Sequence, residues 1–182
     1  MLGLYLGDGC LSEQPRGVLR LRITLDDHYP GIIGECVEAM AGVLPSNRPH
    51  VQKNHGAHCV EVGISSKQLR CLFPQHAPGR KHERRIVLAA WQQKLTTKRP
   101  DLLVRGLIHS DGCRSMNTVR HGGKAYAYPR YTFSNRSDDI KRIFCDACDL
   151  LEIEWRVMNR WNISVARRES VARLDEFVGP KA

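Results

Sequence analysis

The chain has 182 residues and a mass of 20.7 kDa, with 42% hydrophobic and 26% charged residues, which is typical of a globular protein and excludes a disordered one. It has no apolar run near the roughly 18 residues of a membrane span, no basic leader, and seven irregularly spaced cysteines in a chain large enough to fold without disulfides. These features exclude a membrane protein or a secreted mini-protein and favour a reducing, cytoplasmic setting. The net charge of +9 favours a polyanionic partner such as nucleic acid.

Elements in the first part of the chain follow one another in a simple order. A short helix ends at Asp8-Gly9, and the alternating segment 19–24 predicts a strand. Segment 30–43 predicts a helix, 49–53 and 58–64 predict two more strands, and 65–73 predicts a second helix. A linker of roughly 74–99 follows, with a helix around 88–95.

The second part of the chain repeats the first in outline. Residues 2–10 reappear as residues 105–113, so that two Asp-Gly-Cys tripeptides lie 103 positions apart. Strand 130–134, helix 138–151, strands 154–158 and 161–165 and helix 167–177 then follow in the same order. We therefore predict an α+β fold of two pseudo-symmetric αββαββα repeats, 1–99 and 100–182, with two antiparallel sheets forming a saddle around a central helix pair. Segment 12–15 and a long loop, 115–129, are expected at the ends of the saddle.

Each predicted sheet has one apolar and one polar face. Leu19 and Leu21 alternate with Arg20 and Arg22, and the later strands alternate similarly, with Trp161 and Trp155 expected in the core. An ordinary solvated sheet face would look similar, but two such faces on a strongly basic chain favour nucleic acid. The candidate DNA-binding residues are Arg16, Arg20, Arg22, Thr24, Gln52, Lys53, Arg120, Lys124, Arg130, Thr132, Ser134, Arg136 and Asn162.

Small residues recur at a spacing of four in both repeated helices. Gly3 and Gly7 in the first copy correspond to Gly106 and Ser110 in the second, and each pair shares one helical face. Such faces let two backbones approach closely, so we expect the helices to pack on each other and to end side by side. The glycine after each aspartate is expected to adopt the left-handed conformation that commonly ends a helix.

The helix ends carry an aspartate each, Asp8 and Asp111. Either residue alone would be an ordinary surface residue in a turn, but the duplication favours a site. Two carboxylates that face each other and two negative helix ends are unfavourable unless a cation binds between them. Mg²⁺ suits such a site, with the carbonyl groups of Gly7 and Ser110 as further ligands, and it would support phosphodiester hydrolysis.

The two motifs resemble those of the LAGLIDADG homing endonucleases in their single-chain, two-motif form. Segment 1–9 matches at Gly3, Leu4 and Asp8-Gly9, and segment 104–112 matches at residues 106–108 and Asp111-Gly112. Segment 79–86 is similar to the Gly-Lys-Lys stretch that often precedes the second motif. The first acidic position of the motif is replaced by Leu6 and His109.

This resemblance implies an endonuclease that is specific for a long, nearly asymmetric site in double-stranded DNA and cuts it across the minor groove to leave short 3′ overhangs. Asp8 and Asp111 would hold Mg²⁺, and Lys81 and Lys181 would be the basic catalytic residues. Mn²⁺ is expected to substitute, and Ca²⁺ to permit binding without cleavage. A monomer is expected because one chain supplies both motifs, and DNA binding implies a location at the nucleoid.

Two alternative functions remain on the same fold. One is a cleavage-deficient DNA-binding transcriptional regulator, and the other is an RNA splicing maturase. Retention of both aspartates favours the nuclease, because a pure binding protein needs neither.

Several other clusters are expected to carry no chemistry. His50, His55, His58 and Cys59 do not have the spacing of a zinc site. Cys145 and Cys148 are expected to be half-buried thiols, Cys10 and Cys113 to be packing residues, and Arg167-Arg168 to be a solvated helix start.

Overall fold

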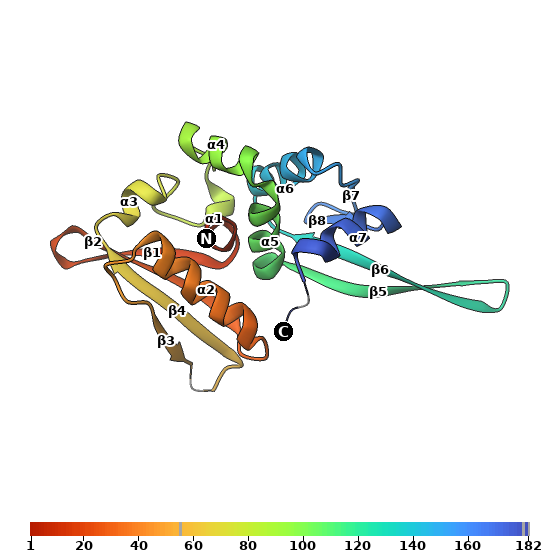
Figure 1. Ribbon diagram of the computed structural model, residues 1–182, viewed down its shortest axis with the longest axis horizontal. Coiled ribbons are helices and arrows are strands. Elements are labelled where there is room, and N and C mark those ends of the chain that lie inside the picture. The colour runs from red at the N-terminus through yellow and green to blue at the C-terminus, as the bar shows by residue number, and fades with distance from the viewer. Residues whose placement is uncertain (55, 180, 182) are drawn as a thin grey trace.

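The computed structural model describes all residues except 55, 180 and 182, and describes residue 121 by its backbone only. Two four-stranded antiparallel sheets lie on either side of a central pair of helices, α1 and α5 (Figure 1). The α+β architecture of two repeats is therefore confirmed.

The first repeat begins with the central helix α1 (Leu2–Asp8) and continues directly into its sheet, whose strand order is β1-β2-β4-β3. Its further elements are β1 (Gly9–Gln14), the 3₁₀ turn η1 (Pro15–Gly17), β2 (Val18–Asp26), α2 (Pro30–Val43), β3 (His50–Lys53), β4 (Cys59–Ser66) and α3 (Leu69–Leu72). The connection to the second repeat contains η2 (Lys81–Glu83) and α4 (Ala90–Lys98).

The second repeat has the same order of elements, and its sheet has the matching strand order β5-β6-β8-β7. Its elements are α5 (Pro100–Asp111), β5 (Gly112–His121), β6 (Lys124–Ser134), α6 (Asp138–Leu150), β7 (Arg156–Val157), β8 (Asn162–Val165) and α7 (Arg168–Phe177). Equivalent topology in the two halves confirms the internal symmetry, whereas the domain boundary at residue 99 stays a prediction.

Two predicted segments were wrong. Strand β4 runs on to Ser66, so the helix predicted over 65–73 shrinks to the single turn α3. The loop predicted over 115–129 is a β-hairpin, in which β5 and β6 pair from Gly112↔Phe133 to His121↔Lys124 (Figure 1). Gly122 and Gly123 both have positive φ (56° and 78°), which lets a two-residue turn close the hairpin.

The cores lie on the apolar sheet faces. Leu19, Leu21 and Ile23 on β2 are at most 1% exposed, and Tyr131 and Phe133 on β6 are each 1% exposed. The aromatic ring of Phe133 stacks on Phe144 of α6, with 4.4 Å between the ring centroids.

The alternation predicted for the last strand fails at two positions. Trp161 is 41% exposed, because β8 begins only at the next residue, whereas Trp155 packs partly buried against the core. Ser164 is only 6% exposed, because this small side chain lies between Thr132 of β6 and Arg156 of β7.

The central helices approach closely at their glycines. A Cβ on Gly3 would lie 2.5 Å from the Leu103 carbonyl oxygen, and one on Gly106 would lie 3.0 Å from the Leu4 nitrogen. A Cβ on Gly7 would collide with the Ser110 side chain. The predicted packing of the two helices through their small residues is confirmed, and it brings both helix ends to the same region. Among the described residues, no helix is long and apolar enough to cross a membrane.

Candidate active site

Each central helix ends at its aspartate and turns at once into a strand. Asp8 is the last residue of α1 and Asp111 the last of α5, and the glycine that follows each is the first residue of β1 or β5. The expected left-handed glycines were wrong, because Gly9 (φ −74°, ψ 138°) and Gly112 (φ −114°, ψ 168°) are extended. Glycine is needed for space instead: a Cβ on Gly9 would lie 2.5 Å from the Tyr5 Cα.

The two carboxylates are partly buried, and burial disfavours the ionised form of both. Burial, and then the charge of Asp111, raise the pKa of Asp8 from an ordinary 3.8 to about 6, against the opposing effects of Lys81 and Lys181. Burial also raises the pKa of Asp111, although the Asn135 amide donates a hydrogen bond of 2.6 Å to its Oδ2. A carboxylate whose pKa burial holds above its ordinary value is stabilised in its ionised form when a cation binds, so this donor set fits a hard divalent ion.

Lys81 extends from the connection between the repeats to the end of α1. Its ammonium donates to the carbonyl oxygens of Tyr5 (2.7 Å), Leu6 (2.9 Å) and Gly7 (2.5 Å). Burial lowers its pKa to about 8, although Asp111 and Asp8 oppose this change. An ammonium has three donors, so all of those on Lys81 neutralise the negative end of α1, and the Gly7 carbonyl expected to bind metal accepts one of them.

Lys181 reaches the equivalent region from the other end of the chain. Its Nζ donates to the Gly112 carbonyl oxygen at 2.5 Å and lies 6.0 Å from the ring centroid of Tyr29. Burial lowers its pKa, and the thiol of Cys113 and the carboxylates of Asp8 and Asp111 oppose this change. Both predicted lysines therefore lie near both predicted aspartates, with different carbonyl partners.

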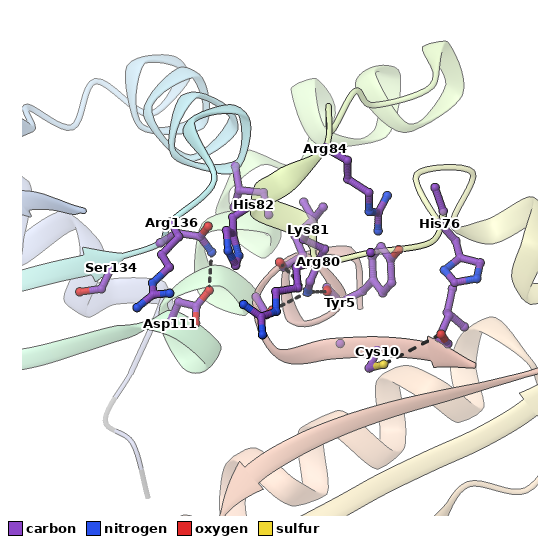
Figure 2. Close-up of a pocket in the computed structure, with 18 of the residues that line it drawn as sticks. Tyr5, Cys10, His76, Arg80, Lys81, His82, Arg84, Asp111, Ser134 and Arg136 are labelled. Carbon is purple, nitrogen blue, oxygen red and sulfur yellow. Dashed lines mark hydrogen bonds between the residues drawn. The ribbon is translucent and has the colours of Figure 1, made fainter. Parts of the chain in front are cut away.

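Each aspartate opens into its own pocket beside one lysine. Asp111 and Lys81 line a pocket of about 740 Å³ together with Arg80, His82 and Arg136 (Figure 2). Asp8 and Lys181 line a smaller pocket of about 340 Å³. The second pocket is also lined by Ser110, Thr24, Asp26, Tyr29 and His109.

Sequence reasoning missed several residues of the larger pocket. Asn135, the hydrogen-bond donor to Asp111, follows the predicted strand 130–134 directly, and that position at a strand end was the available signal. Trp161 also lines this pocket, with the guanidinium of Arg160 lying 4.5 Å from its ring centroid. Its exposure corrects the expectation of a core tryptophan.

The predictions for the cysteines, for Arg167 and for the histidine cluster have different outcomes. Cys10 and Cys113, expected to be packing residues, are exposed because strand alternation places Cys10 opposite Arg22 and Cys113 opposite Thr132, on the polar faces. Cys145 and Cys148 are buried rather than half-buried. Arg167 precedes α7 and pairs with Glu154 and Glu169, and residue 55 of the histidine cluster lies outside the described residues.

The polar face of the first sheet carries a small network. Arg20 donates to Glu61 at 2.8 Å and contacts His50 at the same distance, and Arg22 lies 3.6 Å from Glu61. Thr24 and Gln52 lie opposite Glu61 on the two neighbouring strands. Lys53 instead lies opposite the buried Val60 and pairs with Asp27 at 3.1 Å, and Arg16 is exposed in η1.

On the second sheet the hairpin register assigns the remaining residues to faces. Lys124, Arg130, Thr132 and Ser134 alternate with the buried Tyr131, and Ser134 donates to Asn162 at 2.5 Å. Arg120 lies opposite Ala125, which places it on the Tyr131 face rather than with Arg130. Arg136 follows the strand, with its guanidinium 5.8 Å from the Trp161 ring centroid.

The two sheets, the packed helix pair and the aspartates at its end define the two-motif LAGLIDADG homing-endonuclease fold, which nearly the whole chain shares with solved members of that class. The chain is similar to mesophilic variants of the homing endonuclease I-DmoI (TM-score 0.64, 12% identity, 98% of this chain and 87% of that chain). It is similar to the LAGLIDADG meganuclease I-AabMI bound to uncleaved DNA (TM-score 0.57, 13% identity, 96% of this chain and 80% of that chain). It is also similar to full-length DUF199/WhiA from Thermotoga maritima (TM-score 0.56, 12% identity, 98% of this chain and 53% of that chain).

I-DmoI is also solved in complex with DNA and Mn, and with DNA and Ca. No protein-family model matches the sequence, and no curated protein matches it.

Proposed function

We propose that the protein is a site-specific endonuclease that hydrolyses phosphodiesters in both strands of duplex DNA. The observation that carries this proposal is the placement of Asp8 and Asp111 at the ends of two packed helices, with Lys81 and Lys181 beside them. A protein that only binds DNA gains nothing from burying two carboxylates, because they repel phosphate and raise each other's cost of ionisation.

Asp8 and Asp111 would hold the divalent ion, Mg²⁺ by preference, with Mn²⁺ as a substitute and Ca²⁺ permitting binding without cleavage. Such an ion supplies an activated water and stabilises the charge of the leaving oxygen. Asn135 keeps the Asp111 carboxylate oriented and favours its ionised form through the 2.6 Å hydrogen bond. Lys81 favours the ionised form of both aspartates electrostatically while its three donors stay on α1.

The polar sheet faces are the proposed DNA-binding surface. Arg20 and Arg22 of β2 and Arg130 and Thr132 of β6 face the same side as the polar residues of their neighbouring strands. The β5–β6 hairpin extends this surface beyond the sheet, and a two-stranded ribbon fits the major groove. The DNA complexes of I-DmoI and I-AabMI support the same class of partner.

The finer expectations belong to the same proposal. They are a long, nearly asymmetric target, action as a monomer, short 3′ overhangs and a location at the nucleoid. The unequal surroundings of the two aspartates support an asymmetric target, because the two strands would be cut in different pockets.

Selection of bound duplexes from a random library in Ca²⁺, followed by a change to Mg²⁺, tests the proposal. Enriched duplexes should be cut with short 3′ overhangs, and Asp8→Asn and Asp111→Asn should bind but not cut. Asp101→Asn is the matched control, since Asp101 lies in α5 but pairs with Arg99 at the far end of that helix.

Three results would contradict the proposal. Selective binding without cutting in Mg²⁺ or Mn²⁺ would identify the regulator. Structured RNA that outcompetes duplex DNA at matched salt would identify the maturase. Cleavage by Asp8→Asn at the parent rate would refute the assigned site.

A further inference from the structure

A cluster of two histidines and one aspartate lies at one end of the first sheet, outside the pockets described above. Asp27 and His28 form the turn between β2 and α2, and His58 immediately precedes β4. The β2–β4 register pairs Asp26 with Cys59, and the Asp27 nitrogen donates to the His58 carbonyl oxygen at 3.4 Å. These backbone contacts bring the end of β2 and the start of β4 to the same end of the sheet (Figure 1).

The side chains converge on one carboxylate oxygen. Asp27 Oδ1 lies 3.5 Å from His28 Nδ1 and 3.9 Å from His58 Nδ1. One potential ligand atom from each of the three residues lies within 4.8 Å of the other two. The two imidazole rings have centroids 5.4 Å apart at an interplanar angle of 38°. Ligands of a tetrahedral zinc ion, with bonds of about 2.0–2.1 Å, lie about 3.4 Å from one another, so a small inward movement of the exposed His58 completes the arrangement.

The surroundings of the cluster already orient the shared carboxylate. Lys53 Nζ contacts Asp27 Oδ2 at 3.1 Å, which leaves Oδ1 facing the two rings. The Asp27 side chain is only 15% exposed, whereas those of His28 and His58 are 66% and 88% exposed. His28 Nδ1 also contacts Asp26 Oδ1 at 2.6 Å, so a fourth potential metal ligand, this carboxylate oxygen, lies beside the cluster.

We propose that Asp27, His28 and His58 form a binding site for one transition-metal ion, of the class of Zn²⁺, Co²⁺ or Ni²⁺. Two imidazoles and one carboxylate suit these ions, whereas Mg²⁺ prefers oxygen ligands, so the site is chemically distinct from the pair Asp8 and Asp111. The bound ion would cross-link the turn before α2 to the start of β4. This inference does not depend on the proposed endonuclease function.

Co²⁺ titration followed by visible absorption tests the proposal. The protein is the full chain carrying Asp8→Asn and Asp111→Asn, and Mg²⁺ is present in excess so that hard oxygen sites are filled. We expect one Co²⁺ per chain with the intense absorption of tetrahedral coordination, displaced by Zn²⁺. Zn²⁺ should also raise the Tm of this protein by about 2 °C or more.

His28→Ala and His58→Ala should each weaken Co²⁺ binding at least about tenfold and abolish the Zn²⁺-dependent rise in Tm. His76→Ala is the matched control and should bind as the parent does, because His76 lies on the larger pocket instead. All three variants should melt like the parent without metal, which separates loss of binding from loss of folding. Failure to bind Co²⁺ in excess Mg²⁺, or unchanged binding by His58→Ala, would overturn the proposal.

Discussion

Replacement of Asp8 by asparagine should stabilise the protein, even though it removes a proposed catalytic group. The native pKa of Asp8 is about 6, against an ordinary 3.8, because burial and Asp111 disfavour the carboxylate. Each pKa unit is equivalent to about 1.36 kcal/mol, so the ionised carboxylate costs about 3 kcal/mol of folding stability at neutral pH. The asparagine side chain carries no charge, and we expect the substitution to recover about 1–3 kcal/mol, or about 3–10 °C in Tm for a chain of this length.

The stability gained by Asp8→Asn should increase with pH. The native state binds the Asp8 proton more tightly than the unfolded state does, so the parent loses stability as the pH rises from about 4 to about 6. Asp8→Asn lacks this loss. The difference in Tm between the variant and the parent should therefore be greatest near pH 7 and vanish near pH 4.

Thermal melts in a chelator, followed by circular dichroism across this pH range, measure the effect. Asp101→Asn is the control, because Arg99 lowers the pKa of Asp101, which is the opposite of the shift at Asp8. Removing the Asp101 carboxylate should therefore not raise the Tm. Added Mg²⁺ should stabilise the parent more than Asp8→Asn, since the ion relieves the same repulsion. A variant with an unchanged or lower Tm at pH 7, or with the same gain at pH 4 as at pH 7, would refute the reasoning.

Two further predictions concern packing and the pH dependence of cleavage. Gly3→Ala should lower stability by about 1–3 kcal/mol, since its Cβ would lie 2.5 Å from a backbone oxygen of α5, whereas Gly34→Ala, with nothing within 4 Å, should raise it by about 0.5–1 kcal/mol. Urea unfolding of both variants checks this, and equal effects would contradict the proposed close approach of the helices. Asn135→Leu should raise the pKa of Asp111 and move the acid limb of the cleavage pH profile upward, because the ionised form loses its 2.6 Å hydrogen bond. An unmoved acid limb in kcat/KM would show that this hydrogen bond does not tune the reaction.

The sequence determined much of the architecture because its patterns are local. Helix 30–43 has the same bounds in the structure, since Pro30 begins it and its apolar spacing persists to Val43. The alternation in β2 assigned its buried and polar faces correctly. The recurrence of glycine and aspartate at equal spacing was sufficient to predict both the helix pair and the neighbouring helix ends, because a shared small-residue face lets two helix backbones approach closely.

Tertiary structure decided what depends on neighbours from distant parts of the chain. The pairing of β5 with β6 turned a predicted loop into a hairpin and placed Arg120 on the face opposite Arg130. Asn135 reaches Asp111, and Lys81 reaches the carbonyls of α1, only after segments of the same repeat that are distant in sequence pack against each other. The cluster of Asp27, His28 and His58 likewise exists only through the register of β2 with β4. Periodicity along the chain reports which face a residue takes, but the partner that a side chain meets is set by the packing of whole elements.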